Sequence, residues 1–109
     1  MSPGPSPGAG RRIDFDRVGG AARRNAEAVV RAFLPDGRRE GNEYLARNPR
    51  RPDKTLGSFN VNLVNGKWAD WAAGVAGSDL TSLVAYLQDL SQRDAAISLA
   101  SALGVSAYE

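Results

Sequence analysis

The sequence predicts one α+β domain with an N-terminal helix, a three-stranded antiparallel sheet and two C-terminal helices packed on one face of the sheet. Three observations support this fold class. Apolar and polar residues alternate through residues 58–64, Asn65-Gly66 is a favoured hairpin turn, and apolar residues recur with helical spacing on both sides of the hairpin. A chain of 109 residues is long enough to bury one modest core.

The N-terminal part is expected to begin with a disordered tail at residues 1–12, whose Pro, Gly and Ser residues cannot build a core. A single domain then spans residues 13–109. Residues 17–41 hold a helix and a polar connector, because apolar side chains recur every three or four residues up to Leu34. Pro35 and the Asp-Gly pair after it end the helix, since Pro disfavours helical conformation in the preceding residue and Asp-Gly favours a turn.

The central hairpin joins residues 58–64 to residues 67–71, and residues 42–47 are expected to add the third strand. Asn-Gly tolerates the positive φ angles of a two-residue type I′ turn. Such a turn would place Leu63 directly opposite Trp68.

The alternation divides the side chains of the hairpin between two faces. The predicted core face carries Phe59, Val61, Leu63 and Trp68, with Asp70 near its end. The other face carries Asn60, Asn62, Lys67 and Trp71. We therefore expect one buried and one exposed tryptophan.

The C-terminal third is predicted to form two amphipathic helices after a small-residue loop at residues 72–77. Apolar residues at positions i, i+3, i+4 and i+7 predict a helix over residues 79–90, with Ser78 or Asp79 as its N-cap. A second helix restarts at Ser91 in an arrangement close to a capping box.

The composition excludes several kinds of chemistry. The chain has no Cys and no His, so disulfides, thiol nucleophiles, the usual zinc ligands and His-based acid–base catalysis are excluded. No Ser or Thr has a credible base beside it, so we expect a non-catalytic module without cofactor or small-molecule substrate. No apolar run approaches the ~20 residues of a membrane-spanning helix, so we expect no membrane partner and a cytoplasmic location.

Charge is segregated along the chain. Residues 1–37 hold six Arg or Lys against four Asp or Glu, a net charge of +2. Residues 38–67 hold seven against three, which is +4, and residues 68–109 hold one against five, which is −4. A basic middle indicates a surface that faces a polyanion, although a solvated charged loop gives the same pattern.

Two other kinds of site are weakly indicated. Residues 74–79 precede a helix and suggest a phosphate-binding loop, but Asp79 would put a negative charge where the phosphate must lie, so helix capping is favoured. Asp53, Asp70 and Asp79 could ligate a hard cation, yet three scattered carboxylates lack the dense pattern of calcium loops. We therefore predict no metal site.

A basic loop beside the hairpin favours binding of single-stranded nucleic acid. Proteins of this kind hold phosphates with cations and stack bases on aromatic rings, at about 1–3 kcal/mol per base. Two prolines within residues 48–54 exclude regular structure there and leave an exposed loop. The candidate site residues are Arg47, Arg50, Arg51, Lys54, Asn60, Asn62, Lys67 and Trp71. If both tryptophans were core residues, this signal would be lost.

Several short motifs follow one another in residues 42–105: Asn48-Pro49, Gly-Ser-Phe-Asn-Val-Asn at 57–62, Trp-Ala-Asp-Trp at 68–71 and Ala-Gly-Ser-Asp-Leu at 76–80. In order and spacing they resemble the N-terminal zinc-ribbon domain of bacterial and phage DNA primases. In that family a Cys-Pro-x-His pair precedes the first strand and a Cys-x-x-Cys pair follows the second. Here the first pair is replaced near Asn48, the second falls near residues 70–74, and no zinc ligand is left.

The chain thus resembles a zinc-free variant, of the kind found at the start of phage and plasmid primase-helicase-like proteins. The resemblance implies a module that contacts single-stranded template DNA and assists initiation, with replication proteins as further partners, while a separate domain makes the primer. Loss of the metal implies that the flanking helices supply the missing core. The alternative is a protein-interaction module that docks on a replication or host protein through its acidic C-terminal third and exposed aromatic residue, without binding DNA.

Overall fold

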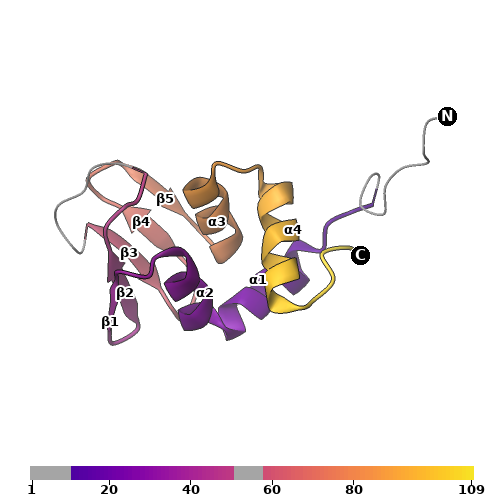
Figure 1. Ribbon diagram of the computed structural model, residues 1–109, viewed down its shortest axis with the longest axis horizontal. Helices are drawn as coiled ribbons and strands as arrows, with labels where there is room; N and C mark the ends of the chain where they lie inside the picture. Colours follow the sequence, from indigo (N-terminus) through magenta and orange to yellow (C-terminus); the bar gives the residue numbers. More distant parts are fainter. Residues whose placement is uncertain (1–10, 51–57) are drawn as a thin grey trace.

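The structure is a computed structural model that describes residues 11–50 and 58–109 (Figure 1). Over these residues it contains four helices: α1 (Phe15–Arg24), α2 (Ala26–Phe33), α3 (Leu80–Gln88) and α4 (Gln92–Leu103). It also contains five strands: β1 (Arg38–Glu40), β2 (Glu43–Ala46), β3 (Phe59–Asn62), β4 (Trp68–Asp70) and β5 (Val75–Gly77). The strands form one antiparallel sheet in chain order, and the helices gather on one side of it (Figure 1).

The predicted three-stranded sheet is wrong, although the domain is α+β as expected. The two strands that were missed are β1, predicted as a polar connector, and β5, predicted as a loop. β1 forms because Gly41, with a φ of +61°, allows the chain to reverse direction in two residues, so that Glu40 pairs with Glu43 of β2. β5 pairs with β4 so that Gly77 lies opposite Trp68, where any Cβ would overlap the indole ring.

The hairpin between β3 and β4 has a four-residue loop, so the predicted two-residue turn and its register are wrong. Val61 lies opposite Trp68, and the Asn62 N–H donates to the Lys67 carbonyl oxygen at 2.7 Å. Within this loop only Gly66 has a positive φ, at 79°, whereas a type I′ turn requires two such residues. Because the register is shifted by two residues, each side chain keeps its predicted face.

Two helices replace the single N-terminal helix that the sequence predicts. α1 begins two residues earlier than expected, because the Asp14 carboxylate caps it by accepting from the Arg17 N–H at 2.9 Å. The chain breaks at Asn25, whose backbone (φ −121°, ψ 33°) leaves the helical region. The break allows α1 to pack against α3 and α4, while α2 ends over β2, where the Tyr44 hydroxyl donates to the Leu34 carbonyl at 2.6 Å.

The two C-terminal helices are present with the caps that the sequence predicts. The Asp79 carboxylate accepts from the Ser82 N–H at 2.8 Å in a capping box, and the Ser91 hydroxyl accepts from the Asp94 N–H at 3.0 Å. None of the helices in the described residues is long and apolar enough to cross a lipid bilayer.

The core lies between the sheet and the helices, and its centre is aromatic. The Phe59 and Trp68 rings stack with their centroids 5.7 Å apart, and the Tyr86 ring of α3 lies 5.2 Å from that of Trp68. The Trp68 indole N–H donates to the Ser82 hydroxyl at 2.9 Å, which satisfies its only polar atom. Other large buried side chains are Tyr44, Leu80, Leu83 and Leu99.

The edge strand β1 is attached to α2 through Glu27. Its carboxylate accepts hydrogen bonds from the guanidinium groups of Arg39 in β1, at 2.6 Å, and of Arg31 in α2, at 2.9 Å. These two hydrogen bonds hold the pKa of Glu27 below its ordinary value. The strand that the sequence does not predict is therefore held by an ionised carboxylate as well as by its partner strand.

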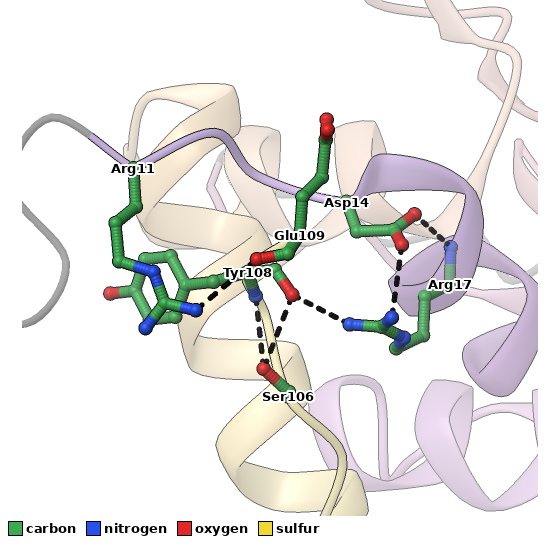
Figure 2. Close-up of polar contacts among 6 residues, drawn as sticks. All are labelled: Arg11, Asp14, Arg17, Ser106, Tyr108 and Glu109. Carbon is green, nitrogen blue, oxygen red and sulfur yellow. Dashed lines mark hydrogen bonds and ion pairs between the residues drawn. The ribbon is translucent and has the colours of Figure 1, made fainter.

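The two ends of the described chain are fastened together, as Figure 2 shows. Ile13 and Tyr108 form an antiparallel bridge, and the Arg17 guanidinium donates to the Tyr108 carbonyl at 2.6 Å. The Arg11 guanidinium donates to the Glu109 carbonyl at 3.2 Å and lies 4.8 Å from the centroid of the Tyr108 ring. Most of the predicted tail, residues 1–10, lies outside the described residues.

Candidate nucleic-acid interface

The sheet has one covered face and one face that we call the open face. The covered face carries the buried side chains Tyr44, Ala46, Phe59, Val61, Trp68 and Asp70. The strand register places the alternating residues on the open face: Arg38, Glu40, Glu43, Leu45, Asn60, Asn62, Ala69 and Ala76. The helices lie on the opposite side of the sheet (Figure 1).

A shallow hollow of about 310 Å³ lies on the open face, over β3, β4 and β5. Four of the predicted site residues line it: Asn60, Asn62, Lys67 and Trp71. Two small residues that also line it, Ala69 and Ala76, lie opposite each other in β4 and β5. The structure thus brings together amides, a cation and an aromatic ring that the sequence places on one strand face.

Trp71 is the most exposed large apolar residue of the described chain, with 74% of its surface accessible, whereas Trp68 has 5%. This confirms the predicted difference between the two tryptophans. The Trp71 N–H donates to the Ser58 carbonyl at 3.0 Å, so its backbone is held beside the start of β3. The ring is free to meet a ligand while its backbone is anchored in the sheet.

Asn62 has a second role as the residue that builds the β3–β4 turn. Its side-chain oxygen accepts from the backbone N–H groups of Val64, at 2.8 Å, and Asn65, at 3.0 Å. Its amide group donates to the Glu43 carboxylate at 3.4 Å. Asn60, in the middle of β3, is therefore the better placed of the two amides for contact with a ligand.

The charges on the open face are mixed. Arg47 follows β2 and is exposed like Lys67, but it lines a second hollow together with residues 33–37 and does not line the hollow on the open face. Arg38 lies on the same face, with its guanidinium 3.7 Å from the Glu40 carboxylate. Sequence reasoning missed Arg38 because β1 was predicted as a connector, although Gly41-Asn42 is itself a hairpin signal.

Arg50 does not join the hollow. Its guanidinium lies over the Tyr86 ring, 4.9 Å from the centroid, and donates to the Tyr86 carbonyl at 2.9 Å. It also lies 3.8 Å from the Asp89 carboxylate, so it caps the C-terminal end of α3. The two remaining predicted cations, Arg51 and Lys54, lie outside the described residues.

A buried polar cluster at the end of β4 is the main feature that sequence reasoning missed. Asn48 and Asp70 are buried, and the Asn48 Nδ2 donates to the Asp70 Oδ2 at 2.8 Å and to the Tyr86 hydroxyl at 2.8 Å. The one available signal was the place of Asp70 on the apolar face of the hairpin. A carboxylate on a core face requires buried donors, and the sequence does not say where they come from.

The fold is similar to that of a solved protein, the Aquifex aeolicus primase, in a crystal structure of its zinc-binding and RNA polymerase domains. The TM-score is 0.69 at 28% sequence identity, and the match covers 87% of this chain and 22% of the primase chain. This supports the primase-like fold that the resemblance implies. Neither a protein-family model nor a curated protein matches the sequence.

A structural zinc site does not fit this chain. Such sites are built from Cys and His, and the sequence contains neither. Across residues 11–50 and 58–109, no three acidic side chains gather closely enough to hold a metal ion. The Asp70 carboxylate at the end of β4 instead accepts from the Asn48 amide and from two backbone N–H groups.

Proposed function

We propose that the open face binds single-stranded DNA, and that the domain is a template-recognition module of primase type. The observation that carries the proposal is the hollow, because four residues selected for this role from the sequence line it together. The primase-like fold supports the same role.

The chemistry of the hollow suits a single strand better than a duplex. An exposed indole offers a stacking surface to one unpaired base, and such stacking contributes about 1–3 kcal/mol. Lys67 precedes β4 and Trp71 follows it, so a strand that crosses the hollow would meet the cation at one end and the stacking ring at the other. Arg38 in the edge strand β1, and Arg47 after β2, are further exposed cations that a bound strand would meet in this proposal.

The module is proposed to be non-catalytic, and the primer-making chemistry is assigned to a separate domain. As the resemblance implies, the setting is a phage or plasmid replication system, where replication proteins would be further partners in the cytoplasm. In this proposal the cationic residues of the open face bind the phosphates of the DNA strand.

Docking of a protein partner on the same face is the second candidate. The observation in its favour is Glu43, which lines the same hollow as the exposed Trp71 and would repel a phosphate. An exposed aromatic ring with charges of both signs around it also suits a protein interface. The two candidates differ in whether binding depends on salt through phosphate contacts.

Titration of a labelled single-stranded oligonucleotide at several salt concentrations tests the proposal. Trp71→Ala should weaken binding by about 1–3 kcal/mol with the salt dependence unchanged, because stacking releases no counterions. Lys67→Ala and Arg47→Ala should each reduce the slope of log K against log salt by about 0.7.

Two matched variants control this experiment. Val64→Ala removes an exposed apolar side chain from the β3–β4 turn, and Arg12→Ala removes an exposed cation from the helical end. Both should bind like the wild type. If the wild type does not bind single strands at low salt, or if Trp71→Ala binds normally, the DNA proposal is rejected and protein docking becomes the better candidate.

A further inference from the structure

A buried cluster connects the two places where the primase resemblance puts zinc ligands. The resemblance aligns the first ligand pair with Asn48 and the second with residues 70–74. The structure joins these places directly, because the Asn48 Nδ2 donates to the Asp70 Oδ2 at 2.8 Å. The exposed fractions of the two residues are 1% and 0%. A side-chain contact therefore links two segments that a metal ion would otherwise link.

The cluster extends to α3 and to the loop after β2. The second proton of the Asn48 amide goes to the Tyr86 hydroxyl at 2.8 Å, and the Tyr86 ring packs on Trp68 in the core. The Asn48 Oδ1 accepts from the Arg50 N–H at 2.8 Å, and the Arg50 guanidinium returns to the Tyr86 carbonyl. Asn48 thus uses both its amide protons and its oxygen, which determines the orientation of its amide group.

The carboxylate of Asp70 also holds two segments. Its Oδ2 faces Asn48, while its Oδ1 accepts from the backbone N–H groups of Ala72, at 3.0 Å, and Ala73, at 3.2 Å. A buried carboxylate is costly without such donors. The loop after β2, the turn after β4 and helix α3 must therefore be in place together for the charge to be tolerated.

We propose that the cluster of Asn48, Asp70, Tyr86 and Arg50 is the structural replacement for the zinc ion of the primase-type domain. It fastens the base of the basic loop, the β4–β5 turn and α3 to one another, and the fold needs no metal. This inference does not depend on whether the open face binds DNA.

An exchange of the two central side chains tests the proposal. Asn48→Asp places two carboxylates face to face, and Asp70→Asn places two amide groups face to face. Each single variant should lower the melting temperature by about 10 °C or more, because buried polar groups lose their partners. The double variant Asn48→Asp, Asp70→Asn restores a carboxylate facing an amide and should recover more than half of the loss.

Milder variants keep the test decisive if the single variants do not fold. Tyr86→Phe removes only the hydroxyl that accepts from Asn48, and it should lower the melting temperature by about 4–8 °C. Tyr108→Phe and Asn65→Asp make the same chemical changes outside the cluster. They should lower the melting temperature much less. A double variant that folds where both single variants fail supports the proposal equally well.

Whether the stability of the wild-type protein depends on a metal ion is tested separately. Thermal unfolding with a strong chelator and with added zinc should give the same midpoint as without either. A lower midpoint with chelator overturns the proposal, and so does a double variant as unstable as the two single losses combined. Single variants with unchanged midpoints overturn it as well.

Discussion

The turns that follow β3 and β4 share one backbone design. Asn62 and Asp70 each begin a five-residue turn, residues 62–66 and 70–74, and the side-chain oxygen of each accepts from the backbone N–H groups two and three residues later. In each turn the fifth residue is a glycine with positive φ, Gly66 at 79° and Gly74 at 70°. The N–H of each glycine donates to the carbonyl of the first residue at 2.9 Å.

The two turns differ in what surrounds their first residue. Asn62 is partly exposed and lies on the open face, whereas Asp70 is fully buried on the covered face and accepts from Asn48, which in turn donates to Tyr86 of α3. The same backbone motif thus forms both hairpin turns. Only in the turn after β4 does its first residue also belong to a buried cluster of polar side chains. We therefore expect the neighbouring segments, and not the turn sequence, to decide how much stability a turn residue contributes.

The largest expected effect concerns the second residue of each turn. Leu63 is buried, with 8% of its surface exposed, whereas Trp71 has 74%. Leu63→Ala should therefore cost about 2–5 kcal/mol of unfolding free energy. Trp71→Ala should cost less than about 0.5 kcal/mol. Urea denaturation of both variants measures the two losses, and similar losses would mean that the two faces are assigned wrongly.

The next effect concerns the first residue of each turn. Asp70→Ala leaves the Asn48 amide and the Ala72 and Ala73 N–H groups without this acceptor and should cost about 3 kcal/mol or more. Asn62→Ala removes bonds at a partly exposed turn and should cost about 1 kcal/mol. The same denaturation curves give both values. A larger loss at Asn62 would show that the buried cluster contributes little.

A smaller and equal effect is expected at the two turn glycines. Gly66→Ala and Gly74→Ala should each cost about 1–2 kcal/mol, because an L-residue is strained at positive φ. No heavy atom would lie closer than 3.5 Å to a new Cβ at either position, so strain is the only cost. A clear difference between the two variants would contradict the shared backbone design.

The smallest effect on stability is expected at Asn60, which lies between the two turns on the open face. Asn60→Ala should change the unfolding free energy by no more than about 0.5 kcal/mol. If this amide reads base edges, the variant should change the preference among homopolymeric single strands more than the overall affinity. Competition between such strands measures this, and an unchanged order of preference would remove Asn60 from the proposed site.

Local patterns in the sequence were enough to assign the side chains to faces and to place several elements. Alternation through β3 and β4 separated Trp68 from Trp71 correctly, even though the predicted register was wrong by two residues. A shift of the register by an even number of residues leaves every side chain on the same face of the sheet. The N-caps Asp79 and Ser91 were also predictable, since capping depends on residues within one turn of the helix.

Tertiary pairing decided the elements that have weak local signals. β1 and β5 have three residues each, and their polar or small residues favour strands only when a partner strand offers its hydrogen-bonding edge. The break at Asn25 is similar, because α1 packs with α3 and α4 while α2 packs over Tyr44. Neither a three-residue strand nor a helix break that depends on packing leaves a recognisable hydrophobic periodicity in the sequence.

The sequence was sufficient to predict that Asn60, Asn62, Lys67 and Trp71 lie on one face of the hairpin, where they line the same hollow. Only the tertiary structure decided that Arg50 is held by α3 and that Asn48 meets Asp70, because these contacts join residues 36 and 22 positions apart. Contacts of that length follow from the path of the whole chain and leave no periodic pattern. A carboxylate on an apolar strand face indicates that buried donors must exist, but the fold alone selects which segment provides them.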